Sequence, residues 1–153
     1  MVTTAVIVNA RPQNIVTVLE WPGGRVVQQQ PHLRGTGEMT FVGSDRLIER
    51  GWTHFQAWQL APPGMTQLWK SDDPPGSLSA ISEQLIAAGG HTREILLFST
   101  ATGRVESRLA TGAWASTVAF LPAGRLALGT FGGAVQIWDT SARSLIRTLS
   151  GNP

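Results

Sequence analysis

Short apolar segments recur along this chain at a nearly constant distance. Each segment holds about four residues that are mostly apolar, and each ends at residues typical of turns. The last large side chains of four such segments, Leu19, Trp58, Phe98 and Trp138, are 39, 40 and 40 residues apart. A period of this length is typical of stacked or radially arranged repeats. We therefore expect one repeat architecture, in which these four residues build a continuous core.

The last repeat shows the pattern most clearly. Its apolar segments lie at 118–120, 125–129, 135–138 and 145–149, with glycine, proline, serine or aspartate between them. Four short strands joined by tight turns make an antiparallel meander. The same order returns one and two periods earlier, and three periods earlier only three strands have room. We therefore predict a single all-β domain with little or no helix, about fifteen strands, and repeats at approximately 1–35, 36–75, 76–112 and 113–153.

The last repeat contains Ser116–Thr130 followed by Val135–Asp139, which ends in a Trp-Asp dipeptide. These residues resemble a WD40 repeat. The copy at Leu85–Ser99 keeps the pattern with Phe98 in place of the tryptophan, and the first two copies are degenerate. The resemblance implies a β-propeller segment of four-stranded antiparallel blades, about four in number, with the first one incomplete.

The chain departs from the WD40 pattern where that family places a hydrogen-bonded brace. The position of the usual Gly-His pair is occupied by Thr111-Gly112-Ala113, and the turn that usually holds an aspartate is Gly132-Gly133. In the last repeat only Thr130 and Trp138 have side chains suited to such a brace. We therefore expect no full brace, and we expect the blades to be held by apolar packing between sheets.

The number of repeats is small for a closed ring, because propellers usually close with four to eight blades. An open arc leaves sheet faces and an edge uncovered, which favours association. Three arrangements are compatible with the repeats: a segment of a longer propeller, a chain that closes with another copy or another chain, and a small four-bladed ring. We favour the first two.

Composition and charge narrow the class of partner. The 153 residues carry a net charge of +2, without a block of like charges. We therefore expect no nucleic-acid partner. The sequence has no apolar run near the roughly 18 residues that span a bilayer, so we expect no membrane partner. It also has no cysteine, which fits a reducing compartment, and we expect a soluble, cytoplasmic protein.

Signatures of catalysis are missing from the sequence. It contains no G-x-S-x-G, H-E-x-x-H or P-loop motif, and no G-x-G-x-x-G before a helix. The histidines His32, His54 and His91 do not share a spacing that suits a metal site. We therefore expect no enzyme activity, no catalytic residue, no metal and no cofactor.

The candidate binding site lies in the turn before the third strand of each repeat. The period puts Trp52, His91 and Phe131 at one equivalent position, and Trp114 lies in a loop near them. Aromatic anchors dominate binding hot spots, so these four residues are predicted to bind a protein partner at one propeller face. In the alternative interpretation the rings cover the cores between blades.

The predicted function is therefore a non-catalytic protein–protein interaction scaffold of WD40 type. The alternative is a self-assembling structural module. Such a module would complete a propeller ring by homo-oligomerisation or with another part of a longer chain. Repeats of this kind specify a scaffold and leave the identity of the partner open.

Overall fold

The fold is all-β, as the repeat pattern predicts. The computed structural model describes residues 5–10, 15–20, 23–31, 36–51, 54–61, 64–71, 76–90 and 92–150. Within these ranges the chain forms fifteen strands and no helix. Trp52 and His91, two of the predicted site residues, lie outside the described residues.

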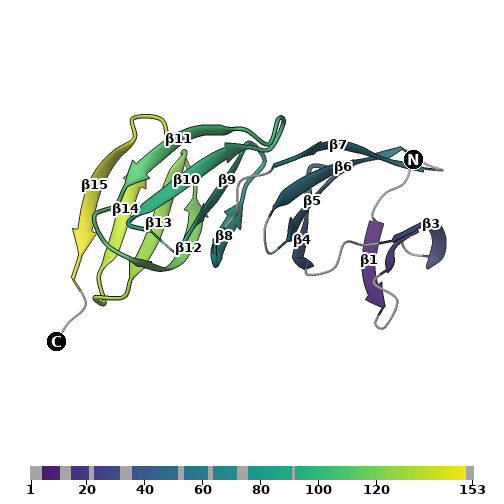
Figure 1. The fold of residues 1–153 in the computed structure, drawn as a ribbon, viewed down its shortest axis with the longest axis horizontal. Helices are drawn as coiled ribbons and strands as arrows, with labels where there is room; N and C mark the ends of the chain where they lie inside the picture. The colour runs from purple at the N-terminus through teal and green to yellow at the C-terminus, as the bar shows by residue number, and fades with distance from the viewer. Residues whose placement is uncertain are drawn as a thin grey trace.

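The strands form four antiparallel sheets that follow one another in chain order (Figure 1). The first sheet contains β1 (Ala5–Ala10), β2 (Ile15–Glu20) and β3 (Arg25–Pro31). The second contains β4 (Thr36–Val42), β5 (Arg46–Gly51), β6 (Phe55–Ala61) and β7 (Gly64–Lys70). The third contains β8 (Leu78–Ile81), β9 (Leu85–Gly89), β10 (Glu94–Ser99) and β11 (Val105–Ala110). The fourth contains β12 (Ala115–Leu121), β13 (Arg125–Thr130), β14 (Val135–Asp139) and β15 (Ser144–Leu149).

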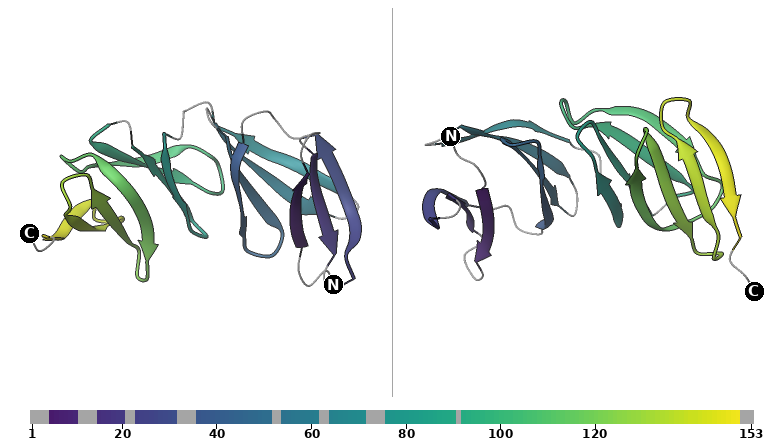
Figure 2. Two further views of the ribbon diagram at one scale, coloured as in Figure 1. Left: turned by 90° about the horizontal axis from the view of Figure 1, so that it is seen from below. Right: turned by 180° about the vertical axis from the view of Figure 1, so that it is seen from behind.

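The sheets are arranged as consecutive blades of a partial β-propeller (Figure 2). In each four-stranded sheet every strand pairs with its neighbours in sequence, so each sheet is a simple meander. The first strands of the third and fourth sheets, β8 and β12, lie next to each other. The first described sheet has three strands, which confirms the prediction of about four blades with an incomplete first one.

Among the side chains that the structure describes, two apolar cores lie between successive sheets. The core between the second and third sheets consists of Val42, Ile48, Phe55, Ala57, Ile86, Ala88 and Phe98. The core between the third and fourth sheets consists of Ala87, Ile95, Leu97, Leu109, Ala115, Leu126, Leu128 and Trp138. Successive side chains of a strand point to opposite faces, so β9 supplies residues to both cores. The third sheet is therefore apolar on both faces.

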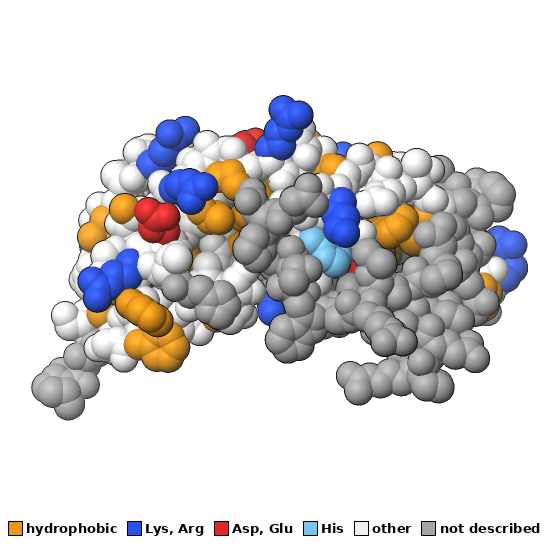
Figure 3. Space-filling view, viewed as in Figure 1, with side chains coloured by type: hydrophobic (Ala, Val, Ile, Leu, Met, Phe, Trp, Pro, Cys, Tyr) orange, Lys and Arg blue, Asp and Glu red, His pale blue; other side chains and the backbone are white. Residues whose placement is uncertain are grey.

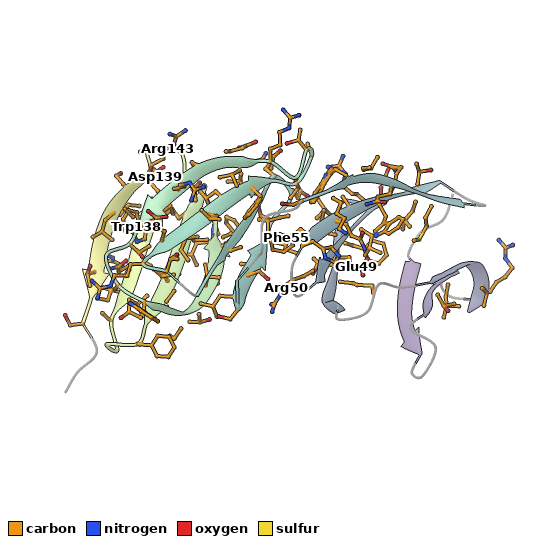
Figure 4. All side chains as sticks on the ribbon, in the orientation of Figure 1. Glu49, Arg50, Phe55, Trp138, Asp139 and Arg143 are labelled. Atoms are coloured by element: carbon orange, nitrogen blue, oxygen red, sulfur yellow. The ribbon has the colours of Figure 1, made fainter. Side chains whose placement is uncertain are left out.

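Phe98 and Trp138, two of the aromatic residues of the repeat, lie in these cores, as predicted. Phe98 is completely buried and Trp138 is nearly so, whereas Trp58 is half-buried. The Phe98 ring meets that of Phe55 edge to face, with ring centroids 5.6 Å apart and planes at 64°. Phe55 lies at the junction of the second and third sheets (Figure 4), and an aromatic pair in this geometry adds about 1 kcal/mol beyond its burial.

A tryptophan joins the second and third sheets at their outer strands. The indole Nε1 of Trp69, on β7, donates a hydrogen bond to the carbonyl oxygen of Thr100 at 3.0 Å. The ring also covers Gly103, where a Cβ would lie 2.3 Å from the ring carbon Cε3. Gly103 has a φ of +68°, so both the backbone of this turn and the space above it require glycine.

Candidate functional site

Trp114 and Phe131 lie side by side at one end of the fourth sheet. Trp114 directly precedes β12 and Phe131 directly follows β13, so the antiparallel pairing of these strands brings them together. The backbone N–H of Phe131 donates to the carbonyl oxygen of Trp114 at 3.0 Å. Their side chains are 51% and 74% exposed, and hydrophobic side chains gather at this end of the sheet in Figure 3.

The turn that carries Phe131 is held by hydrogen bonds around Thr130. The Thr130 hydroxyl accepts from the N–H of Ala134 at 3.2 Å and donates to its carbonyl at 3.1 Å. The Thr130 N–H also donates to the Ala134 carbonyl, at 2.8 Å, and Gly133 closes the turn with a bond to Thr130. The backbone on both sides of Phe131 is already held in place. Its conformational entropy therefore falls little when a partner binds the ring.

The loop that carries Trp114 is held in a similar way by Thr111. This buried hydroxyl lies 2.8 Å from the carbonyl oxygen of Arg93 and 2.9 Å from that of Ala113. The N–H of Thr111 donates to the same Arg93 carbonyl. Two hydroxyl-stabilised turns therefore present the two exposed aromatic rings.

A buried side-chain bridge connects this loop to the core. The indole Nε1 of Trp138 donates to Oε1 of Gln136 at 3.0 Å, and Nε2 of Gln136 donates to the Thr111 carbonyl at 3.2 Å. The sequence predicted no full brace, although Thr130 and Trp138 have side chains suited to one. In the structure Trp138 donates to Gln136, and the Thr130 hydroxyl bonds to Ala134.

The repeat pattern itself contains the signal for this bridge. Glutamine stands two residues before tryptophan at Gln56 and Gln136, whereas Leu96 stands two residues before Phe98. Residues two apart on a strand share a face, so a side chain at the first position reaches the ring at the second. A tryptophan brings an N–H that must be satisfied when it is buried, and phenylalanine does not.

In the second sheet, a buried carboxylate accepts the hydrogen bond of the tryptophan N–H. Oε2 of Glu49 accepts hydrogen bonds from Nε1 of Trp58, at 3.1 Å, and from Nε2 of Gln56. His54 is also buried nearby. Burial, reinforced by the positive charge of Lys70, lowers the pKa of His54, and Glu49 opposes that shift.

A cavity of about 580 Å³ lies toward the opposite ends of the strands. It is lined mainly by the β8–β9, β10–β11, β12–β13 and β14–β15 turns. The hydroxyls of Thr100 and Thr140 on its wall donate to backbone carbonyls of neighbouring turns, each at 2.7 Å. Its charged lining consists of two arginines and two glutamates, whose charges balance: Arg46, Arg143, Glu83 and Glu106. The lining therefore favours neither an anion nor a cation.

The β14–β15 turn on the rim of this cavity is closed by Asp139. Its Oδ1 accepts from the N–H groups of Ala142 and Ser141, at 2.8 and 2.9 Å, and from the Ser141 hydroxyl. The bond from the Ala142 N–H, followed by that from the Ser141 hydroxyl, lowers the pKa of Asp139. Asp139 and Arg143 lie together at this turn in Figure 4, so the aspartate has a turn-forming role.

The described part of the chain contains no group of three or more histidine, aspartate or glutamate side chains that could hold a metal ion. Among the same residues no helix is long and apolar enough to cross a membrane. Of the aromatic side chains that the structure describes, Trp114 and Phe131 are the exposed ones.

Comparisons with solved structures identify the fold. The chain is similar to Hsv2 of Kluyveromyces marxianus, with a TM-score of 0.78 and 10% identity over 97% of this chain and 46% of that one. Hsv2 of Kluyveromyces lactis gives 0.79 and 9%, over 97% and 48%. BamB of Moraxella catarrhalis gives 0.69 and 13%, over 97% and 51%. These proteins are β-propellers, and at such identities the likeness shows the fold alone.

The chain spans about half the length of these solved structures. No family model matches the sequence, and no curated protein matches it. The partial propeller therefore rests on the strand topology and on structural likeness.

Proposed function

We propose that this partial propeller is a non-catalytic interaction scaffold of WD40 type, which binds a protein partner through the face that presents Trp114 and Phe131. The observation that carries the proposal is the exposure of these two rings on turns that hydrogen bonds hold in place. Large exposed aromatic side chains at the centre of a contact are typical hot spots.

The size of the two rings supports a binding role. An aromatic side chain buries 150–250 Å², so covering the exposed part of each ring removes on the order of 100 Å² from water. At about 25 cal/mol per Å² this is worth roughly 3 kcal/mol for each ring. The fixed turns reduce the ordering cost, so most of this free energy is available for binding. Trp52 and His91 belong to the proposed face by their repeat position.

The test compares alanine variants of the two rings in a quantitative pull-down from native extract. Trp114→Ala and Phe131→Ala are each expected to lower partner recovery at least tenfold, because truncating a hot spot costs about 2 kcal/mol or more. Leu145→Ala is the matched control. Leu145 is 44% exposed and pairs with Trp138, away from Trp114 and Phe131. Its recovery should equal that of the wild type.

Thermal unfolding of the same samples separates binding from packing. The variants should unfold within a few degrees of the wild type, because exposed side chains contribute little to stability. Full recovery of the partner by both variants would exclude this face as the site. Collapse of the fold would show that the rings are packing residues.

A second candidate function is completion of a propeller ring, with another copy or with another part of a longer chain. The observation that favours it is a set of exposed apolar side chains on the fourth sheet, apart from the aromatic pair: Leu121, Val135, Leu145, Ile146 and Leu149.

A further inference from the structure

The hydrogen bonds that hold the two exposed rings also place an arginine beside them. Arg93 directly precedes β10, in the turn of the third sheet that corresponds to the Phe131 turn of the fourth. Its backbone carbonyl accepts from the N–H of Thr111 at 3.0 Å and lies 2.8 Å from the Thr111 hydroxyl. The same hydroxyl lies 2.9 Å from the Ala113 carbonyl, and the carbonyl of Trp114 accepts from Phe131. Backbone contacts therefore place Arg93 next to the loop that carries Trp114.

The side chain of Arg93 is exposed and carries a charge that nothing nearby neutralises. Within the described ranges its guanidinium forms no ion pair, hydrogen bond or ring contact. Glu94, the carboxylate that follows it in sequence, lies 3.7 Å from the guanidinium of Arg108 instead. The positive charge of Arg93 is therefore available to a partner.

Arg93 and Trp114 both offer hydrogen-bond donors and no acceptor. A guanidinium has five N–H donors and an indole has one, and neither group accepts. The indole N–H of Trp114 also has no hydrogen-bond partner among the described residues. Donors beside two apolar rings favour a ligand that has an acceptor close to an apolar group. A carboxylate suits this place best, because charge-assisted hydrogen bonds are about twice as strong as neutral ones.

A second arginine lies at the same end of the neighbouring joint. The guanidinium of Arg50 donates to the hydroxyl of Ser79 at 3.3 Å and to the carbonyl of Ser77 at 3.4 Å. Ser77 directly precedes β8, just as Trp114 directly precedes β12. Positive charge is therefore present at this end of both the second and the third sheet.

We propose that the partner presents an acidic segment to the aromatic face, in which an aspartate or glutamate lies close to a large apolar side chain. The apolar side chain packs on Trp114 and Phe131, and the carboxylate accepts hydrogen bonds from Arg93. This inference rests on the proposed function, since it names the partner chemistry of the same face. Charge complementarity selects the occupant, because a basic segment would bring a like charge against Arg93.

The test is a selection of random peptides, displayed on phage, against the immobilised protein. The enriched peptides should combine aspartate or glutamate with an aromatic residue or leucine. Their affinity, measured by fluorescence anisotropy, should fall about tenfold in Arg93→Gln, because a hydrogen bond to a charged group is lost. Their affinity for the wild type should also fall with added salt, and this dependence should be weaker in Arg93→Gln.

The fold and the charge are controlled separately. Arg93 contacts Thr111 through its backbone carbonyl, so Arg93→Gln should unfold at the temperature of the wild type. Arg104→Gln is the matched control. It removes the same charge from an exposed arginine in the β10–β11 turn, at the opposite end of the third sheet. Its affinity for the enriched peptides should equal that of the wild type.

Trp114→Ala separates the acidic specificity from the binding site itself. If the enriched peptides lose affinity in Trp114→Ala and keep it in Arg93→Gln, the rings bind and the acidic specificity is wrong. Enrichment of basic or uncharged peptides would overturn the inference in the same way and leave the proposed function intact. If no peptide is enriched, or none responds to Trp114→Ala, the inference and the aromatic site both fail.

Discussion

The bridge between Gln136 and Trp138 makes a quantitative prediction, because the chain already contains its apolar counterpart. The third repeat has Leu96 and Phe98 at the equivalent positions. We therefore consider Gln136→Leu, Trp138→Phe and the double substitution, which gives the fourth repeat the pair that the third repeat uses. Both native side chains are at least 91% buried, so neither partner reaches bulk water when the other is removed.

Each single substitution leaves a buried polar atom without its partner. In Gln136→Leu these atoms are the indole N–H and the Thr111 carbonyl; in Trp138→Phe it is Oε1 of the glutamine. An unsatisfied buried group costs about 1–3 kcal/mol, and the smaller ring adds about 1 kcal/mol for lost packing. Each single variant should lose about 2–3 kcal/mol. The double variant should lose about 2 kcal/mol, because its indole and carboxamide are both gone.

The assay is equilibrium urea unfolding of the wild type and the three variants. The double-mutant cycle should give a coupling free energy of about 2–4 kcal/mol, at or above the upper end for contacting residues. As a control, Gln136→Leu combined with Gly43→Ala, in the β4–β5 turn of the second sheet, should be additive within about 0.5 kcal/mol. Additive losses for Gln136→Leu and Trp138→Phe would refute the inference that the two residues form one unit.

Three further predictions concern single sites. Gly103→Ala should lower the free energy of unfolding in urea by about 2–4 kcal/mol, because its Cβ meets the Trp69 ring at a positive φ. Gly112→Ala has the same φ in open space and should lower it by only about 1 kcal/mol. Equal losses would contradict the steric explanation. Ala123→Asn should raise the free energy of unfolding by about 0.5–1 kcal/mol, because alanine at a φ of +62° is strained and asparagine tolerates that region. The pKa of His54 is lowered in the folded state, so its contribution to stability is complete above the unfolded pKa near 6.5 and is lost as the pH falls through the lower folded pKa. The free energy of unfolding in urea, measured from pH 8 to 5, should show this loss. In His54→Gln it should depend less on pH over the same range.

The sequence predicted the fold because the repeat places apolar strands and turn residues in the same order every 40 residues. The turn at Gly132-Gly133 and the burial of Phe98 and Trp138 follow from that order alone. The proximity of Trp114 and Phe131 also follows, since both flank paired strands of one blade. These are local features, or features of one repeat compared with another.

The features that sequence reasoning missed depend on side-chain orientation or on contacts between blades. Gln136 was overlooked because its role depends on which neighbour its carboxamide reaches. The bond from Trp69 to Thr100 joins residues 31 positions apart in different sheets. The cavity is formed by turns from several blades, and no single repeat contains its lining.

The tryptophan at the outer strands also gives the second and third sheets a contact outside their shared core. The second and third sheets are held together at two places. The apolar core joins them on the inside, and Trp69 joins them at the outer strands. Strand pairing gives Ser107 as the equivalent of Trp69 in the third sheet, because Trp69 pairs with Ala57 and Ser107 with Leu97. A serine side chain is too short to cover the next turn as the Trp69 ring does. The joint between the third and fourth sheets therefore depends on its apolar core and on the bond from Gln136 to the Thr111 carbonyl.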